Sequence, residues 1–152
     1  MPRQQWVLAL ATCGGVGYLP AMPGTWGSLA ALPLWWGLSH LGAWGYGLAL
    51  AVLLAISVWV TGAAQDYLGP DHPAIVLDEM VGLLIALAGV PLKWPWIIIG
   101  FALFRLLDIW KPFPIKYCEK LPRGWGVVLD DAAAGLLTRA ALAVIVVFGG
   151  GG

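Results

Sequence analysis

A long stretch without charge near the N-terminus is the feature that most limits what this chain can fold into. No Lys, Arg, Asp or Glu occurs in residues 4–65 of the 152-residue sequence. A small soluble domain has a large surface for its volume, so it could hardly hide such a stretch from water. Only 11% of all residues are charged, whereas soluble domains have about a quarter. The composition therefore predicts a membrane protein.

The distribution of apolar residues predicts an all-α fold, a polytopic membrane bundle of about four to five membrane helices, some short or re-entrant. Residues 43–64 are the clearest transmembrane segment, because they carry no charge over more than roughly 18 residues. Residues 14–24 are rich in Gly and Pro and predict a loop. Other helices are expected over residues 6–13, 25–40, 75–88, 94–111 and 129–148, with a polar loop over 115–128.

The order of these segments predicts one domain with a defined orientation. No repeat or boundary divides residues 1–148, and the glycines at 149–152 are expected to form a flexible tail. Alternating helices place the short turns on one side of the membrane and the long polar segments on the other. The basic residues outside the helices fall mainly on the polar side: Arg3, Lys111, Lys116, Lys120 and Arg123, with Lys93 opposite. The positive-inside rule therefore places the polar side in the cytoplasm.

Five carboxylates gather at the polar ends of three predicted helices. Asp78 and Glu79 begin one helix, and Asp108 lies near the end of the next. Asp130 and Asp131 begin the last. Capping and the helix dipole also favour acids at helix starts, which is the alternative explanation for them. Five carboxylates near lipid would repel one another strongly, so a cationic partner is expected.

Two basic side chains and a metal ion are the expected partners of these acids. Arg105 lies one helical turn before Asp108, and Lys111 lies three residues after it, so both can offset part of the charge. Carboxylates without histidine or thiolate ligands select hard cations such as Mg²⁺, Mn²⁺ or Ca²⁺. A site that water and phosphate complete suits Mg²⁺ best.

The sequence Pro-Gly-Thr-Trp-Gly-Ser at residues 23–28 predicts an anion site at a helix start, where free backbone N–H groups join the hydroxyls of Thr25 and Ser28. Ordinary helix capping is the alternative. The segment is not a P-loop, because it lacks Gly-Lys-Ser/Thr. The zero net charge gives no basic stripe and argues against a nucleic-acid partner.

Phosphatase chemistries that use a covalent nucleophile lack their motifs here. Cys118 and Arg123 enclose four residues, whereas a cysteine phosphatase needs five. His40 is expected at the wrong membrane face, and His72 in a polar loop is expected to be solvated rather than catalytic. Metal-activated water is therefore the simplest chemistry for such a site.

Four segments together carry a family resemblance: GYLPAMPGTWGSLAALP at 17–33, IVLDEMVG at 75–82, FRLLDIWKPFPI at 104–115 and GWGVVLDDAAAG at 124–135. Their content, order and spacing closely resemble bacterial phosphatidylglycerophosphatase A over nearly the whole chain. The chain departs from the family pattern at two places. Arg123 stands where the family has glycine, and residues 13–15 read Cys-Gly-Gly where the family usually has Gly-Phe-Gly.

The resemblance implies a Mg²⁺-dependent enzyme of the bacterial inner membrane, with its active site facing the cytoplasm. Such an enzyme hydrolyses phosphatidylglycerophosphate to phosphatidylglycerol and inorganic phosphate. The metal-binding and catalytic residues that it implies are Asp78, Glu79, Asp108, Asp130 and Asp131, and the phosphate-binding residues are Thr25, Ser28, Arg105 and Lys111.

Other classes of membrane protein also collect carboxylates. A cation-coupled transporter is the chief alternative, but its acids would lie near the bilayer midplane. A CDP-alcohol phosphatidyltransferase would carry an Asp-Gly-x2-Ala-Arg run, which is missing, and a non-catalytic scaffold would have no use for the acids. Arg139 is expected to face the bundle and to meet an acid or the phosphate pocket. The sequence leaves the oligomeric state open.

Overall fold

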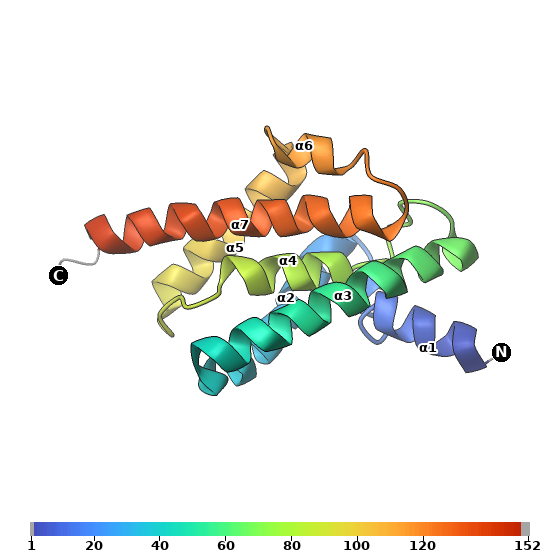
Figure 1. Cartoon of the computed structure of the whole chain (residues 1–152), viewed down its shortest axis with the longest axis horizontal. Coiled ribbons are helices and arrows are strands. Elements are labelled where there is room, and N and C mark those ends of the chain that lie inside the picture. The colour runs from blue at the N-terminus through green and yellow to red at the C-terminus, as the bar shows by residue number, and fades with distance from the viewer. Residues whose placement is uncertain (1, 150–152) are drawn as a thin grey trace.

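The computed structural model describes residues 2–149, and the regular structure of those residues is helical throughout (Figure 1). The predicted all-α class is confirmed. The elements are α1 (Pro2–Ala11), the 3-10 turn η1 (Val16–Tyr18), α2 (Pro23–Leu38), the 3-10 turn η2 (Ser39–Leu41), α3 (Gly42–Leu68), α4 (Leu77–Ala86), α5 (Trp94–Trp110), α6 (Ile115–Cys118) and α7 (Gly124–Gly149).

Several predicted boundaries are wrong, beginning with the first helix, which covers Pro2–Ala11 rather than residues 6–13. The last helix begins at Gly124 rather than at residue 129, because Arg123 has a left-handed φ of 53° and turns the chain directly into α7. The loop expected over 115–128 therefore contains α6 and the first turn of α7. The clearest apolar segment continues to Leu68, so α3 carries Asp66 in its last turn. Helix α7 also includes Gly149 of the predicted tail, and the rest of that tail lies outside the described residues.

Helix α4 is short and largely buried, and it packs against α2, α3 and α7 (Figure 1). Glycines let it approach α7 closely. A Cβ atom on Gly82 would lie 2.9 Å from the carbonyl oxygen of Asp131, and one on Gly135 would lie 2.4 Å from the carbonyl oxygen of Gly82. Larger residues would force the helices apart. The close contact sets the N-terminal parts of α4 and α7 side by side, and each of these parts carries an acidic pair.

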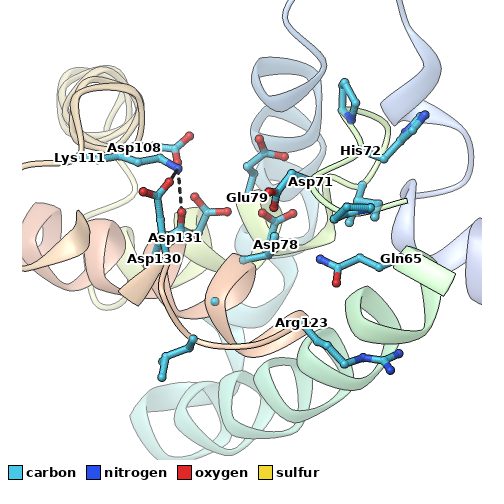
Figure 2. Close-up of a pocket in the computed structure, with 17 residues that line it drawn as sticks. Gln65, Asp71, His72, Asp78, Glu79, Asp108, Lys111, Arg123, Asp130 and Asp131 are labelled. Carbon is cyan, nitrogen blue, oxygen red and sulfur yellow. Dashed lines mark hydrogen bonds and ion pairs between the residues drawn. The ribbon is translucent and has the colours of Figure 1, made fainter. Parts of the chain in front are cut away.

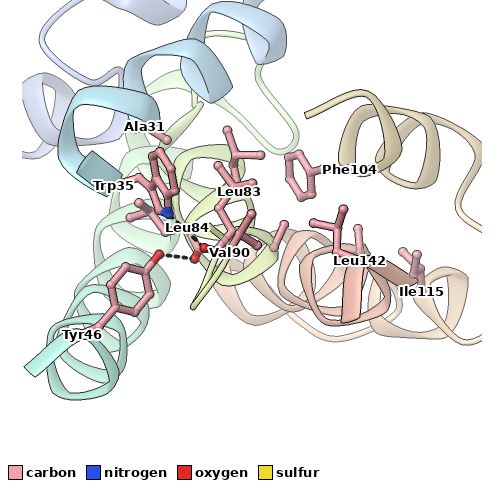
Figure 3. Close-up of a cluster of buried hydrophobic side chains, with 12 residues drawn as sticks. Ala31, Trp35, Tyr46, Leu83, Leu84, Val90, Phe104, Ile115 and Leu142 are labelled. Carbon is pink, nitrogen blue, oxygen red and sulfur yellow. Dashed lines mark hydrogen bonds between the residues drawn. The ribbon is translucent and has the colours of Figure 1, made fainter. Parts of the chain in front are cut away.

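The opposite end of α4 lies in an apolar core with two ordered polar contacts (Figure 3). The Trp35 indole N–H donates a hydrogen bond of 2.9 Å to the carbonyl of Leu87, and the Tyr46 hydroxyl donates to that of Leu84. Carbonyl groups at the end of a helix lack helical partners. The two buried side chains therefore satisfy backbone groups that the helix itself leaves free.

Two helical stretches are long and apolar enough to cross a membrane. They are Pro23–Leu68, which joins α2 to α3 through η2, and α7. Large apolar side chains on these and neighbouring helices face outward, and Trp44 is 95% exposed. Such a surface suits lipid better than water, so the two stretches are candidate membrane spans.

Candidate active site

The N-terminal parts of α4 and α7 and the end of α5 meet at one pocket of about 610 Å³ (Figure 2). All five predicted carboxylates line it: Asp78 and Glu79 from α4, Asp108 from α5, and Asp130 and Asp131 from α7. Asp131 lies close enough to Asp78 and Asp108 for their charges to act on one another. The structure thus brings together residues that are separated by up to 53 positions in the sequence.

Four of these carboxylates are buried, Glu79 is partly buried with an 18% exposed side chain, and several of the oxygens have no partner. Asp131 is only 2% exposed, and Asp78 and Asp130 are each 5% exposed. Oδ1 of Asp78, Oε2 of Glu79 and Oδ1 of Asp130 are buried without a hydrogen bond. A buried polar atom without a partner costs free energy, and a charged one costs more. The pocket is therefore built to bind something that the chain itself does not supply.

Two cations offset part of the negative charge. Arg105 Nη1 donates to Asp108 and lies 4.0 Å from Glu79 Oε1. Lys111 Nζ donates to Asp130 Oδ2 over 2.8 Å, and it also contacts Glu119 at the rim. Two cations facing the five carboxylates leave a formal excess of three negative charges.

The position of Lys111 follows from local backbone structure. It ends α5 in a left-handed conformation with a φ of 52° and precedes Pro112, so the chain turns and its side chain reaches α7. Burial lowers the pKa of Lys111, but the hydrogen bonds and charges of Asp130 and Glu119 outweigh burial and raise it above its usual value. Lys111 therefore stays protonated at neutral pH and remains a cation beside the acids.

The donor set fits a hard divalent cation. Within residues 2–149, no three His, Cys, Asp or Glu side chains already stand at the spacing of a bound ion. The three carboxylate oxygens without partners nevertheless belong to neighbouring acids, and the excess negative charge calls for a cation. Oxygen donors without nitrogen or sulfur are those that Mg²⁺ prefers.

The predicted anion segment lies beside the acids, but Ser28 does not line the pocket. Helix α2 begins so close to α4 that a Cβ atom on Gly24 would lie 2.2 Å from Glu79 Oε1 and 3.0 Å from Arg105 Nη1. Ser28 is fully buried, and its hydroxyl donates to the carbonyl of Gly24 over 2.8 Å. The Ser28 hydroxyl is therefore bonded within its own helix, and a role in phosphate binding stays a prediction. Thr25 is half-buried at the same helix start, and its role stays a prediction.

Arg105 also differs from the position that the sequence suggested. It is not among the residues that line the pocket, and its side chain is only 14% exposed behind the carboxylates. Its contacts with Glu79 and Asp108 indicate that it holds these two acids in place. A direct contact between Arg105 and phosphate stays a prediction.

The pocket includes residues that the sequence reasoning missed. His72, in the loop before α4, lines it, although the sequence suggested a solvated side chain. The N–H of Ala74 donates to His72 Nδ1 over 3.2 Å, which leaves Nε2 as the free ring nitrogen. Gln65, Asp71 and Glu119 also line the pocket. The one sequence signal that could have found His72 is its place six residues before Asp78, on the same polar side of the membrane.

Arg123 lies at the rim of the pocket and is held from α3. Its Nη2 atom donates to the Gly62 carbonyl over 2.8 Å and to both carboxylate oxygens of Asp66. Cys13 lies near the acids in the turn after α1. Burial, followed by the charges of Asp78 and Glu79, raises the pKa of its thiol to about 12. A raised pKa favours the neutral thiol of Cys13 at neutral pH.

Arg139 does not reach the acids. It is half-buried, and its Nη2 lies 3.6 Å from the position that a Cβ on Gly89 would take, near the turn between α4 and α5. Across residues 2–149 it makes no ion pair and no hydrogen bond. The expectation that it meets an acid or the phosphate pocket is wrong, because eight residues of helix carry it away from Asp131 toward the other end of α4.

The fold and the pocket define an apolar, all-α protein with a buried acidic site at one end of its helices. The chain belongs to the phosphatidylglycerophosphatase A family, whose model matches residues 9–146.

Two curated relatives support this assignment, and a third similar protein bears another name. The chain is 44% identical to phosphatidylglycerophosphatase A of Haemophilus influenzae over 145 residues, which is 91% of the chain and 85% of the relative. It is 38% identical to that of Escherichia coli over 136 residues, or 88% and 79%. It is also 37% identical over 153 residues, or 95% and 96%, to a Bacteroides thetaiotaomicron protein with the provisional name phosphatidylinositol-3-phosphatase. No solved structure matches the chain.

Proposed function

We propose that this protein is a Mg²⁺-dependent membrane phosphatase that hydrolyses phosphatidylglycerophosphate to phosphatidylglycerol and inorganic phosphate. The observation that carries the proposal is the pocket of five carboxylates, four of them buried, with an excess of negative charge and unpartnered oxygens. Membership in a phosphatase family supports hydrolysis and argues against a transporter. The names of two relatives favour this substrate over other lipid phosphates.

The proposed location is the bacterial inner membrane, with the pocket facing the cytoplasm. Two candidate spans and the apolar outer surface support a membrane location. Four to five membrane helices follow if α4 and α5 also enter the bilayer, with α4 too short to span it alone. The basic residues near the pocket end support the cytoplasmic orientation. The lipid tails would then stay in the bilayer while the headgroup enters the pocket.

In this proposal the carboxylates of α4, α5 and α7 hold Mg²⁺, which supplies Lewis-acid stabilisation of the phosphate and lowers the pKa of a bound water. Arg105 holds Glu79 and Asp108 in position. Lys111 remains charged beside Asp130 and offsets negative charge that develops on the phosphate oxygens. A carboxylate of the set that does not hold the ion would orient the attacking water and accept its proton as the water oxygen bonds to phosphorus. The bond between phosphorus and the glycerol oxygen breaks, and that oxygen takes a proton from solvent to give the alcohol of phosphatidylglycerol.

The test measures phosphate release from purified full-length protein in detergent with phosphatidylglycerophosphate, with Mg²⁺ or with EDTA. Phosphatidylinositol 3-phosphate serves as the competing substrate, because one relative bears that name. We expect release from phosphatidylglycerophosphate that EDTA abolishes. Equal phosphate release in EDTA would refute the proposed requirement for Mg²⁺. Release from the inositol lipid alone would refute phosphatidylglycerophosphate as the substrate.

Metal binding is measured separately with Mn²⁺ as a paramagnetic probe. Asp78→Asn and Asp130→Asn each remove a carboxylate with an unpartnered oxygen, so both variants should bind Mn²⁺ more weakly than the unchanged protein. Asp66→Asn is the matched control. Asp66 is exposed, is not one of the five pocket carboxylates, and forms its ion pair with Arg123. Equal Mn²⁺ binding by all of these proteins would exclude the pocket as the metal site.

A further inference from the structure

Exposed apolar side chains cover the segment between α5 and α7. Phe113 is 78% exposed, Tyr117 57% and Trp125 55%. The rings of Phe113 and Tyr117 meet edge to face, with 5.5 Å between their centroids. Lys120 Nζ lies 4.8 Å above the centre of the Tyr117 ring. Phe113, Tyr117 and Lys120 therefore lie together, and with the exposed Lys116 of α6 and Trp125 of the first turn of α7 they are called here the aromatic–lysine face.

The two lysines of this face carry charge that no carboxylate neutralises. Of the four basic residues in this segment, Lys111 pairs with Asp130 and Glu119, and Arg123 pairs with Asp66. Lys116 and Lys120 are exposed and form no ion pair with any residue from 2 to 149. Free ammonium groups therefore lie next to exposed rings.

The face is held rigidly at the rim of the pocket. Ile115 is fully buried and anchors α6 against α7. A Cβ on Gly126 would lie 2.3 Å from the carbonyl oxygen of Leu121 and 3.0 Å from that of Glu119, so the loop after α6 packs directly on the start of α7. The same loop contributes Glu119 and Leu121 to the pocket wall.

We propose that the aromatic–lysine face docks on the headgroup layer of anionic phospholipids and concentrates them at the mouth of the pocket. Tyr and Trp rings prefer the boundary between the apolar and polar parts of a bilayer, and nearby Lys side chains bind anionic headgroups. An acidic protein would be attracted to the lysines but would not need this many exposed rings. The proposal rests on the membrane location and lipid substrate proposed above.

The test measures energy transfer from the protein's tryptophans to dansyl-labelled lipids in proteoliposomes of phosphatidylcholine. One series contains labelled phosphatidylglycerol and the other labelled phosphatidylcholine. Each lysine near the headgroups favours anionic lipid by roughly fivefold. We therefore expect the unchanged protein to prefer labelled phosphatidylglycerol, and the preference to fall toward one in Lys116→Gln/Lys120→Gln. It should also weaken in 0.5 M salt, in which the Debye length falls to about 4 Å.

Lys93→Gln is the matched control, because Lys93 is also an exposed lysine but lies at the turn before α5, at the other end of the bundle. This variant should keep the full preference. A double variant that still prefers anionic lipid as strongly as the unchanged protein would overturn the proposal. The energy-transfer measurement does not depend on catalysis, so it still tests the docking proposal if the proposed activity is not found. If the activity holds, the double variant should also raise the apparent KM for phosphatidylglycerophosphate.

Discussion

The buried polar groups at the two ends of α4 differ in whether they have hydrogen-bond partners. At its C-terminal end, Trp35 and Tyr46 each donate a hydrogen bond to a backbone carbonyl. At its N-terminal end, Asp78 and Glu79 face further acids, and each keeps a buried oxygen without a partner. The two regions share one helix and a similar degree of burial.

This difference distinguishes polar groups that stabilise the fold from polar groups that bind a ligand. A polar group that serves the fold is paired within the fold, because an unpaired one costs stability. Groups that stay unpaired in a buried pocket persist when a ligand pairs them. The unpaired groups at the acidic end therefore lower the stability of the free protein and remain available to a ligand. The hydrogen bonds at the opposite end raise its stability. Substitutions at the two ends should accordingly change different quantities.

The largest effect on activity is expected for Asp131→Asn. It neutralises the most buried of the five acids, which lies next to Asp78 and Asp108. Phosphate release should fall by at least about 100-fold, because a group that holds the ion or orients the water is lost. The melting temperature should rise, by about 2–4 °C for each kcal/mol of relieved repulsion. Activity assays and thermal unfolding without metal measure the two effects. A variant with lower stability and normal activity would place Asp131 among the structural residues.

Arg105 in α5 and Arg139 in α7 give the next contrast. Arg105 contacts Glu79 and Asp108, whereas Arg139 lies near Gly89 without an ion pair in residues 2–149. Arg105→Gln should lower phosphate release by about 10- to 100-fold, as expected when a partner that positions metal ligands is lost. Arg139→Gln should change it less than about twofold, since surface changes away from a site are small. Similar losses in both variants would break the distinction between the ends.

The two histidines test the part of the pocket that the sequence did not reveal. His72→Asn keeps an acceptor for the Ala74 N–H but removes the free Nε2 donor. If Nε2 binds the headgroup, the KM should rise about tenfold, the value of one hydrogen bond to a charged group. His72→Gln, which can restore a donor near Nε2, should recover part of this. His40→Gln is the control, because His40 is exposed and bonds only to the Trp36 carbonyl. An unchanged KM in His72→Asn would leave His72 as a turn residue.

The fold could be predicted from the sequence as far as local signals reach. Long apolar runs gave the helices, and Gly and Pro gave the loop before α2. The start of α7 was missed because Arg123 adopts a positive φ, which is uncommon for arginine and is not predicted by its residue type. Membrane helices were counted from hydropathy, yet α4 is only ten residues long and is covered by its neighbours rather than by lipid.

The site could be predicted where residues share a level along their helices. The five acids came together because each lies near the polar end of its helix, although Asp130 and Asp131 lie more than one turn inside α7. Ser28 does not line the pocket because its own helix offers it the Gly24 carbonyl, an alternative that sequence spacing does not rank. Arg139 was misplaced because its charge suggested a contact with the acids, whereas its distance from Asp131 along α7 prevents that contact. His72 was missed because a loop residue has no periodicity to place it.

The smallest effect on activity is expected for Trp35→Phe, at the C-terminal end of α4. The indole is 3% exposed, and its loss leaves the Leu87 carbonyl without this donor. Unfolding should become easier by about 1–3 kcal/mol, which lowers the melting temperature by several degrees. Activity below that temperature should stay within about twofold, because no pocket residue contacts the indole. Trp36→Phe is the control: Trp36 is 61% exposed, so its stability should change by less than about 0.5 kcal/mol. A large loss of activity in Trp35→Phe at full folding would mean that the two ends of α4 are coupled, and the contrast between them would then describe one cooperative site.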